Sequence, residues 1–456
     1  MKKIVVKIGG SNLKTAKDIS RVIEALRIYG SPLVIVVSAL YGVTDILIQA
    51  LKKVRDARLP IDRFIETLNS IHYKVLNELV DDSRLESKAA GKLEKRLDEL
   101  GKYLLGINCL GDIPEFAKDM ILSYGERMAS PLFEALLNDN GFECRELLPE
   151  QIGLQTVGDH GIATVDFDAC ENRLRKALAG PETFVIPGFY GVSPDARVVL
   201  FGRGGSDYSA AAIARCIGAS SLDIWKDVAG FLSADPEIID SPVTLKKLSY
   251  KEAAELSYFG ARILHPRCVE PLIDRKIPIR ILNIRSFTKK LTPFTVINNH
   301  NIIRGSVVKS VTFTDDIAVL KLVGPGVGSQ PGIIADIAAE LSRARINIKS
   351  IITAQTSINI LLSKSDLKTS LKIAGALNLP SVRQISFLDT ISLIAVVGEG
   401  LLKKPGIAAR IFKAVSKNKI NVLITSTGAS EVSAYFIVNK KDKIKAIGSI
   451  HEEFFK

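Results

Sequence analysis

Before residue 290, the chain alternates short apolar runs with longer stretches whose apolar residues recur every three or four positions. The short runs predict buried strands, and the longer stretches predict helices with one buried face. Their alternation predicts an α/β domain, an open and mainly parallel sheet sandwiched by helices. The expected strands are residues 4–6, 33–37, 183–186, 198–201, 222–225 and 279–282, and the expected helices are residues 19–28, 44–57, 62–79, 122–138, 209–217, 250–258 and 266–275.

Beyond residue 300 the pattern changes and repeats. Each copy has an apolar run, a Pro-Gly pair that opens an amphipathic stretch, and a second apolar run. Proline suits the first turn of a helix, so each pair predicts a helix start. The order predicts two βαββαβ units of α+β type, at 300–390 and 391–456, after a first domain at 1–290. The matching segments are 318–323 with 392–397, Pro331-Gly332 with Pro405-Gly406, and 357–362 with 432–438.

The second copy lacks a fourth strand of its own, because its sequence ends in an expected helix at 442–451. The first copy closes with a strand at or just before 386–393. A strand-like stretch, Ser306–Val311 within 304–313, precedes the first copy. We expect this stretch to complete the sheet of the second copy, so that the first copy is inserted within the second.

The composition of the chain bears on which classes of function are expected. The chain has 456 residues and a net charge of +12, but aromatic residues make up only 6% and the basic residues are scattered. Nucleic-acid binding is therefore not predicted; the charge either attracts small anionic substrates or is ordinary solvated surface. No apolar run is long enough to span a membrane. The five cysteines form no C-x-x-C pair, which predicts reduced thiols in a cytoplasmic protein rather than disulfides or a zinc site.

Gly202–Tyr208, Gly-Arg-Gly-Gly-Ser-Asp-Tyr, lies between an expected strand and an expected helix. Free N–H groups at a helix start bind anions, and glycines allow a ligand to approach the backbone closely. Arg203 adds donors that suit a carboxylate or a phosphate. A tight turn capped by Ser206 or Asp207 is the alternative interpretation.

Other polar turns follow the expected strands. Lys7 with Gly9-Gly10 suits phosphate oxygens, Ser38 and Thr44 suit a small polar substrate, and Glu126 suits an ammonium group. Each of these residues also has a purely structural interpretation. Lys7 could be a lysine in a turn, Ser38 and Thr44 could cap a helix, and Glu126 could form a surface pair with the next arginine. Since the carboxyl ends of parallel strands share one edge of a sheet, we expect these turns to converge there.

Together these motifs resemble the aspartokinase family of the amino-acid kinase superfamily, and the repeats resemble its paired ACT regulatory domains. The resemblance covers nearly the whole chain. The segments that carry it are Lys7–Ser11, Ser38–Asp45, Gly125–Arg127, Gly202–Ser209, Ile224–Pro236 and Tyr258–Arg267.

The resemblance implies ATP-dependent phosphorylation of the side-chain carboxylate of L-aspartate, with Mg²⁺ carried on the nucleotide phosphates and no metal bound by the protein itself. It implies catalytic roles for Lys7, Arg203 and Asp207. The implied substrate contacts are Ser38, Thr44, Glu126, Arg203, Ser206 and Asp207, and the implied nucleotide contacts are Lys7, Gly9, Gly10, Ser11, Lys226, Asp227, Asp235 and Arg262.

This sequence departs from the family pattern mostly on the nucleotide side. Lys226 replaces a threonine, Leu232 a tyrosine and Arg262 a lysine; Glu237 stands where arginine is common, and Ser11-Asn12 replaces Thr-Ser. Two alternatives therefore stay open: a non-catalytic amino-acid sensor that kept the fold, and a kinase of another small carboxylate or a carbamate.

The resemblance further implies a place in lysine and threonine biosynthesis and feedback inhibition by an end-product amino acid, with lysine, threonine and other amino acids all open as the inhibitor. The inhibitor would bind between ACT units across a homodimer or a higher homo-oligomer. Candidate effector contacts are Gly328, Ser329, Asn347, Gln355 and Ser357. A fused homoserine dehydrogenase is not expected, because the sequence ends after the second repeat.

Overall fold

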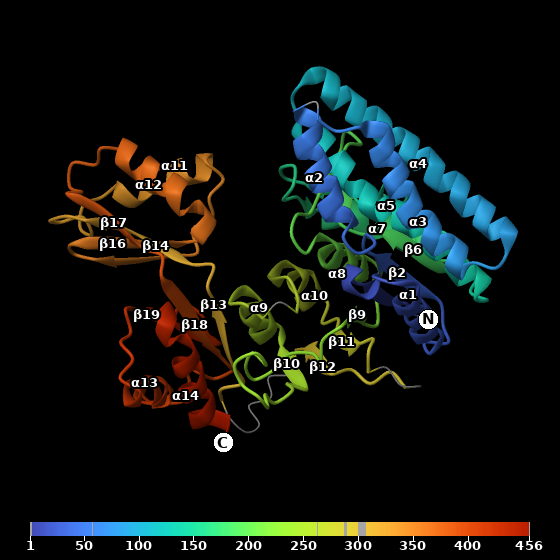
Figure 1. Cartoon of the computed structure of the whole chain (residues 1–456). Coiled ribbons are helices and arrows are strands. Elements are labelled where there is room, and N and C mark those ends of the chain that lie inside the picture. Colours follow the sequence, from blue (N-terminus) through green and yellow to red (C-terminus); the bar gives the residue numbers. More distant parts are fainter. Residues whose placement is uncertain (1, 57, 262, 287–289, 300–306, 456) are drawn as a thin grey trace. The chain divides into compact units, whose positions relative to one another are not determined.

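The computed structural model describes residues 2–56, 58–261, 263–286, 290–299 and 307–455 (Figure 1). The chain divides into two compact units. Unit 1 comprises Met1–Phe231, Thr244–Ser257 and Arg262–Asn301, and unit 2 comprises Leu232–Val243, Tyr258–Ala261 and Ile302–Lys456. Two short segments of the expected first domain thus belong to the second unit.

Unit 1 is built on an eight-stranded sheet in the order β10-β12-β11-β9-β1-β2-β6-β3. Every neighbouring pair is parallel except β11 with β12, as expected for an α/β domain. The sheet strands are β1 (Ile4–Ile8), β2 (Leu33–Val37), β3 (Cys144–Glu146), β6 (Thr183–Pro187), β9 (Leu222–Lys226), β10 (Lys247–Ser249), β11 (Ile279–Asn283) and β12 (Thr295–Asn298). Two hairpins lie outside it, β4 (Thr156–Val157) with β5 (Thr164–Val165) and β7 (Tyr190–Val192) with β8 (Val198–Leu200).

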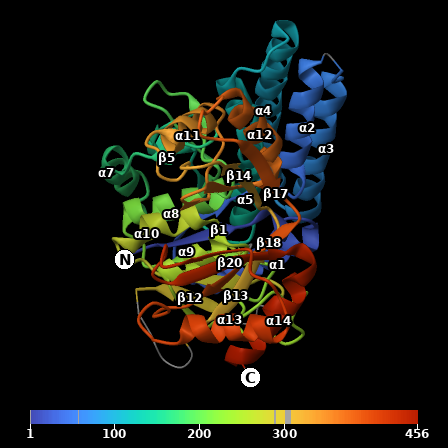
Figure 2. The same ribbon diagram turned by 90° about the vertical axis from the view of Figure 1, so that its left-hand side faces the viewer.

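Helices cover both faces of this sheet (Figures 1 and 2). They are α1 (Ala16–Arg27), α2 (Val43–Arg55), α3 (Ile61–Leu79), α4 (Ser83–Leu110), α5 (Glu115–Asp139), α6 (Pro149–Ile152), α7 (Phe167–Ala177), α8 (Gly205–Ile217), α9 (Tyr250–Tyr258) and α10 (Glu270–Ile273), with single 3₁₀ turns η1 (Gly10–Asn12) and η2 (Pro266–Cys268). In β1, Val6 and Ile8 pack into the core shared with α1–α5. Because side chains alternate along a strand, the intervening Lys7 faces α8 instead.

The expected single helix at 266–275 is wrong. The segment forms η2 and the short α10, with Pro271 in the first turn of α10. Inside a longer helix, Pro271 would lack an N–H and its ring would clash with the carbonyl of Arg267, four residues earlier, so the helix restarts near this proline.

Unit 2 holds two four-stranded antiparallel sheets, in the orders β15-β16-β14-β17 and β13-β18-β20-β19. Their strands are β13 (Ser310–Thr314), β14 (Ala318–Val323), β15 (Ser350–Ala354), β16 (Ser357–Leu362), β17 (Gln384–Leu388), β18 (Ile391–Val397), β19 (Ile424–Thr427) and β20 (Ser433–Asn439). The helices are α11 (Ile333–Arg343), α12 (Leu367–Ala376), α13 (Ile407–Lys417) and α14 (Lys443–Phe455), with 3₁₀ turns η3 (Lys364–Asp366) and η4 (Lys440–Asp442).

The expected strand exchange between the repeats is confirmed, although the strand lies at Ser310–Thr314 and not at Ser306–Val311. β13 precedes the first repeat in sequence but pairs with β18 of the second, with Ser310 opposite Val397 and Thr314 opposite Leu393. The first repeat closes its own sheet with β17, which pairs with β14. Of the predicted stretch 304–313, residues 304–306 lie outside the described residues.

The two short segments from the first domain pack within unit 2. The backbone N–H of Val311 donates to the carbonyl of Ser233 at 2.8 Å, and Ala234 is buried in the core of the second repeat. Phe259 is buried in a cluster drawn from both sheets, with its ring centroid 5.4 Å from that of Tyr435.

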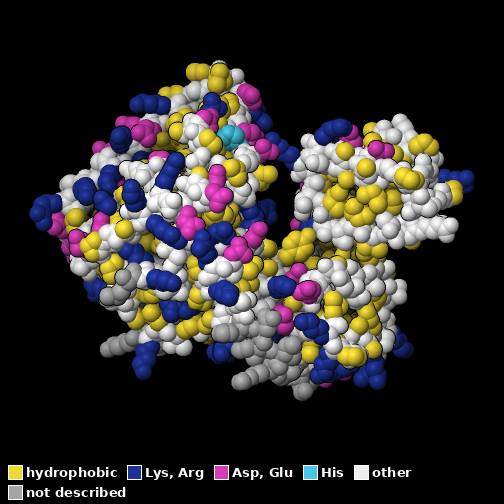
Figure 3. Space-filling model, turned by 180° about the vertical axis from the view of Figure 1, so that it is seen from behind, with side chains coloured by type: hydrophobic (Ala, Val, Ile, Leu, Met, Phe, Trp, Pro, Cys, Tyr) yellow, Lys and Arg dark blue, Asp and Glu magenta, His cyan; other side chains and the backbone are white. Residues whose placement is uncertain are grey.

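One face of the surface shows the same scattered basic residues as the sequence. On the face seen in Figure 3, Lys and Arg side chains are dispersed among acidic and apolar ones and form no continuous stripe. Among the described residues, no helix is both long and apolar enough to cross a membrane.

Candidate active site

Three adjacent strands, β9, β1 and β2, bring polar residues to one edge of the unit 1 sheet. Lys7 of β1 lies in register with Ile224 of β9 and Val36 of β2. Lys226 follows Ile224 by two residues, and Ser38 follows Val36 by two residues. The parallel register therefore places Lys7, Lys226 and Ser38 at the carboxyl edge, where open α/β sheets bind ligands.

A buried ionic cluster lies at this edge. Asp207, in the first turn of α8, pairs with Lys7, and Lys226 Nζ lies 3.2 Å from its carboxylate. Lys7 and Asp207 are each only 5% exposed. Burial alone would raise the pKa of Asp207, but Lys226 and Lys7 outweigh it and hold that pKa at about 2. Burial lowers the pKa of Lys7, and Asp207 opposes this only in part. The cluster holds two positive charges against one negative charge, a net charge that suits a phosphoryl group.

Glu126 completes the buried part of the site. It lies in the middle of α5, is 4% exposed, and accepts a hydrogen bond from Ser206 Oγ at 3.1 Å. Its second carboxylate oxygen, Oε2, is buried and has no hydrogen-bond partner in the part of the chain that the structure describes. Burial raises the pKa of Glu126 to about 7, although its hydrogen bonds and the charge of Lys7 act in the opposite direction. A buried carboxylate oxygen with an open bonding position is suited to bind a cation such as an ammonium group.

The glycine-rich turn before α8 leaves Arg203 free. Gly202 and Gly204 have φ angles of 77° and 69°, a region that favours glycine. A Cβ atom on Gly204 would also collide with the ring and Cβ of His265. Arg203 between them is exposed and forms no ion pair with the residues that the structure describes. Its guanidinium is thus available to an anionic ligand at the turn that precedes α8.

The loop after β1 is tied to the turn after β9. Ser11 Oγ donates to Asp227 at 3.2 Å, and Asn12 Nδ2 donates to the carbonyl of Trp225 at 2.9 Å. A Cβ atom on Gly10 would lie 3.1 Å from the carbonyl oxygen of Ala39. The Gly9-Gly10 backbone thus lies between Lys7, the carbonyl of Trp225 and the carbonyl of Ala39.

A cavity of about 270 Å³ opens at the ends of β9 and β11. Lys246, Asn283, Lys290 and Phe294 line it together with Trp225, and none of these four was a predicted site residue. The strand-end rule that identified Lys226 also applies to Asn283, the last residue of β11, so this part of the cavity had a signal in the sequence. Lys246 and Phe294 had none, since they enter from the segments around β10 and β12.

Of three further predicted site residues, one lies near the site, one belongs to unit 2 and one is not described. Thr44 lies in the first turn of α2, close to Gly125 of α5. A Cβ atom added to Gly125 would be 3.7 Å from Thr44 Oγ1. Asp235 belongs to unit 2, where its carboxylate accepts a hydrogen bond from the N–H of Glu237 at 2.9 Å. Its predicted place beside the nucleotide therefore has no geometric support. Arg262 lies outside the described residues.

The predicted effector residues fall into two groups. The N–H of Gly328 donates to the carbonyl of Gln355 at 3.1 Å, which brings the loops after β14 and β15 together. Exposed Ser329 follows Gly328, and Ser357 begins β16. Asn347, however, precedes β15 whereas Gln355 follows it, so the five residues of that strand, roughly 16 Å in length, separate the two.

His265 caps η2 rather than entering the cluster, and its Nδ1 accepts the N–H of Arg267 at 3.4 Å. Among the described residues no group of three or more His, Cys, Asp or Glu side chains is placed to hold a metal ion.

Comparison with known families matches residues 2–283 to the amino acid kinase family, and residues 312–373 and 394–454 each to an ACT domain. The first match covers the edge described above. The second and third cover most of the two repeats.

Individual proteins extend this similarity over the whole chain. A bifunctional aspartokinase/homoserine dehydrogenase of Buchnera aphidicola is 29% identical over 99% of this chain, which spans 56% of that protein's length. The solved aspartate kinase of Clostridium acetobutylicum is 26% identical, with a TM-score of 0.78 over 99% of this chain and 100% of that one. E. coli aspartokinase III, solved with aspartate and ADP, shares the fold with a TM-score of 0.84 over the full length of both chains, at 22% identity.

Proposed function

Because this chain belongs to the amino acid kinase family and carries two ACT domains, we propose that it phosphorylates the side-chain carboxylate of L-aspartate with ATP, giving 4-phospho-L-aspartate and ADP. The observation that carries the proposal is the buried Oε2 atom of Glu126, which has no partner among the described residues and lies beside the cluster of Lys7 and Asp207. An α-amino acid with a second carboxylate matches both the open anionic position and the positive surroundings.

In this proposal Glu126 binds the ammonium group of aspartate, and Arg203 binds its α-carboxylate. Ser38, Thr44 and Ser206 line the substrate pocket, with Ser206 also holding Glu126 in place. The side-chain carboxylate then lies toward Lys7. An oxygen of that carboxylate attacks the γ-phosphorus, the bond from this phosphorus to the β–γ bridging oxygen breaks, and ADP leaves with the electron pair.

The chain's residues act by position and charge. The attacking carboxylate is already ionised at neutral pH, so no general base is required. Lys7 neutralises charge on the transferring phosphoryl group, and Asp207 orients both Lys7 and Lys226. Phosphoryl transfer is catalysed mainly by such positioning and charge stabilisation.

The nucleotide is proposed to bind along the loop after β1 and the turn after β9. The backbone of Gly9, Gly10 and Ser11 contacts the phosphates, with Lys226 as a further positive group. The cavity lined by Trp225 and Phe294 accepts the base end of the nucleotide. Mg²⁺ is carried by the phosphates, and it supplies further charge neutralisation when bound.

The ACT units are proposed to bind an end-product amino acid and to form a homodimer or higher homo-oligomer. The neighbouring Gly328 and Gln355 are the preferred effector contacts, because a backbone hydrogen bond joins them. All five cysteines are free, which supports a reducing compartment such as the cytoplasm.

An ADP-release assay with L-aspartate, ATP and Mg²⁺ tests the proposal. Turnover should depend on L-aspartate and be lost in Lys7→Ala and Arg203→Ala, but persist in Arg197→Ala, which removes an exposed arginine that pairs with Asp195 away from the edge. Aspartate-induced melting shifts without turnover would favour the amino-acid sensor. Turnover with a different small carboxylate alone would favour the second alternative.

A further inference from the structure

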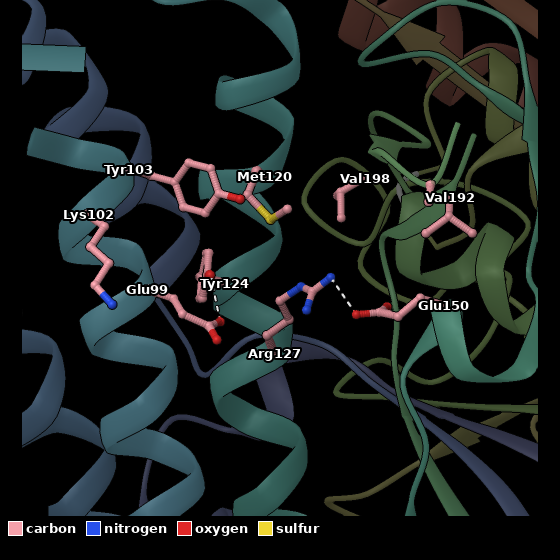
Figure 4. A pocket seen from close by; sticks show the side chains of 10 residues that line it. Glu99, Lys102, Tyr103, Met120, Tyr124, Arg127, Glu150, Val192 and Val198 are labelled. Carbon is pink, nitrogen blue, oxygen red and sulfur yellow. Dashed lines mark hydrogen bonds and ion pairs between the residues drawn. The ribbon is translucent and has the colours of Figure 1, made fainter. Parts of the chain in front are cut away.

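A second and larger cavity lies in unit 1, away from the carboxyl edge of the sheet. It has a volume of about 550 Å³ and lies between α4, α5 and the β7–β8 hairpin (Figure 4). Its size is within the range of small-molecule sites in proteins, about 300 to 1,000 Å³. None of the residues proposed above to bind aspartate or nucleotide lines this cavity.

Arg127 is the central side chain of the cavity. It follows Glu126 on α5, and successive helical residues point about 100° apart. Glu126 therefore meets Ser206, whereas Arg127 meets Glu150 at 3.0 Å on the opposite wall, as the dashed line in Figure 4 shows. Arg127 is only 7% exposed, and its guanidinium lies 4.6 Å from the ring centroid of Tyr190.

Two of the three guanidinium nitrogen atoms of Arg127 have partners in the protein. Its Nε donates to Ser123 Oγ at 3.1 Å, and its Nη2 pairs with Glu150. Nη1 has no partner among the residues that the structure describes. A buried guanidinium held by its neighbours with one nitrogen available is a preorganised receptor for a carboxylate.

The rest of the lining carries both signs of charge. Lys102 is exposed and unpaired among the described residues, and Glu99 accepts a hydrogen bond from Tyr124 at 3.2 Å. With Arg127 and Glu150, the cavity thus presents two cationic and two anionic side chains. A simple anion would meet two carboxylates and a simple cation would meet two basic groups, so a zwitterion is the best match.

Apolar groups cover the remaining wall. Val192 and Val198 of the hairpin face Met120 and Tyr103 across the cavity in Figure 4. A charge pair at one end and an apolar wall at the other correspond to an α-amino acid with a large apolar or aromatic side chain. Aspartate, with its second carboxylate, does not match such a wall.

We propose that this α4–α5 cavity is a second amino-acid site in the catalytic unit, which binds an α-amino acid with a large apolar or aromatic side chain. The ligand carboxylate binds Arg127 and Lys102, and its ammonium group binds Glu99 and Glu150. If the proposed function is right, occupancy changes the affinity for aspartate more than kcat, because Arg127 and Glu126 are consecutive residues of one helix.

Calorimetric titration of the full chain with L-phenylalanine, L-leucine and L-methionine tests the binding step without any need for turnover. At least one should bind, while 3-phenylpropanoate and phenethylamine, which each lack one charge of phenylalanine, should bind much more weakly. Lys102→Glu reverses an exposed charge in the lining without a buried change, and it should weaken binding roughly tenfold or more. Lys95→Glu, on the same helix but outside the lining, is the matched control and should not.

Two further variants separate this cavity from the other sites. Arg203→Ala, at the carboxyl edge, and Gln355→Ala, in the first repeat, should leave the titration unchanged. Arg127→Met should abolish it, with circular dichroism to check the fold. The proposal is overturned if none of the three amino acids binds. It is equally overturned if binding survives Lys102→Glu or is lost in Arg203→Ala or Gln355→Ala.

Discussion

The two sides of the proposed active site are built differently. On the substrate side, Lys7, Glu126 and Asp207 are buried and fixed by ion pairs or hydrogen bonds before any ligand arrives. On the nucleotide side, the side chain of Lys226 is 18% exposed, and its neighbour Trp225 lines a cavity together with residues of β11 and of the loops beside it. The substrate side keeps the family's motif residues, and the nucleotide side has most of the departures.

The contrast separates two physical requirements. Transfer of a phosphoryl group to a carboxylate brings two anions together, so the charges that stabilise them must be fixed in a dry environment. Binding of a nucleotide spreads over many contacts, each of modest value, and tolerates exchange of individual side chains. The substrate side should therefore be sensitive to single substitutions and the nucleotide side should be tolerant.

The largest effect is expected for Lys7→Met. Loss of the buried ammonium group should lower kcat on the order of 100- to 1,000-fold, as for loss of one preorganised charge-stabilising group. Asp207 keeps Lys226 as a partner, so the fold should survive. Steady-state kinetics and thermal melting measure both. Lys3→Met, in the residue just before β1, is the control and should retain kcat. Equal losses of kcat in both variants would contradict the contrast.

Glu126→Gln should raise KM for aspartate roughly 30- to 150-fold, the value of about 2–3 kcal/mol for a charge-assisted contact. The same change should stabilise the free protein above pH 7. Folding raises the pKa of Glu126 from 4.5 to about 7. The free energy of unfolding therefore falls as the pH rises from 4.5 to 7, by about 3 kcal/mol over the whole interval. Melting curves should show a higher Tm for Glu126→Gln at pH 8 and no difference at pH 4. An unchanged KM would remove Glu126 from the substrate site.

The pH dependence of kcat/KM for aspartate should follow Glu126. Its ionised form binds the ammonium group, so below about pH 7 each unit of pH should lower kcat/KM close to tenfold. The carboxylates of aspartate remain ionised down to about pH 5, so they do not contribute there. Glu126→Gln should be flat over the same interval. A flat profile in the unaltered protein would contradict the ammonium assignment.

The smallest effect is expected for Lys226→Thr, which restores the family's residue on the nucleotide side. KM for ATP should rise only several-fold, on the order of 1 kcal/mol, because Lys226 is partly exposed and Asp207 keeps Lys7. Kinetics with ATP as the varied substrate measure this. A decrease in activity as large as that in Lys7→Met would show that the two lysines contribute equally. The substrate side and the nucleotide side would then not differ in their sensitivity to substitution.

The sequence predicted those features that follow from local patterns. Lys7, Ser38 and Lys226 stand at the ends of apolar runs, and parallel strands must bring such ends to one edge. The exchange of β13 between the repeats followed from counting strands, since the second repeat lacked one. Glycines at 202 and 204 predicted the turn, because only glycine readily adopts its backbone angles.

Other features depend on contacts distant in sequence, which local patterns do not contain. Nothing around Asp207 indicates that two lysines, 200 and 19 positions away, share its carboxylate. The buried Oε2 atom of Glu126, which has no partner within the described ranges, is likewise a property of the assembled core. Phe259 belongs to a motif of the expected first domain, yet it packs between the sheets of unit 2, because an apolar side chain does not specify which core it joins.

The most direct test of the substrate side compares L-aspartate with N-acetyl-L-aspartate, which keeps both carboxylates but has no ammonium group. With ATP and Mg²⁺, hydroxylamine converts any acyl phosphate to a hydroxamate, which is measured alongside ADP. We predict equal amounts of hydroxamate and ADP from L-aspartate, and neither product from N-acetyl-L-aspartate. Comparable turnover of the two compounds, or ADP release without hydroxamate, would contradict the account.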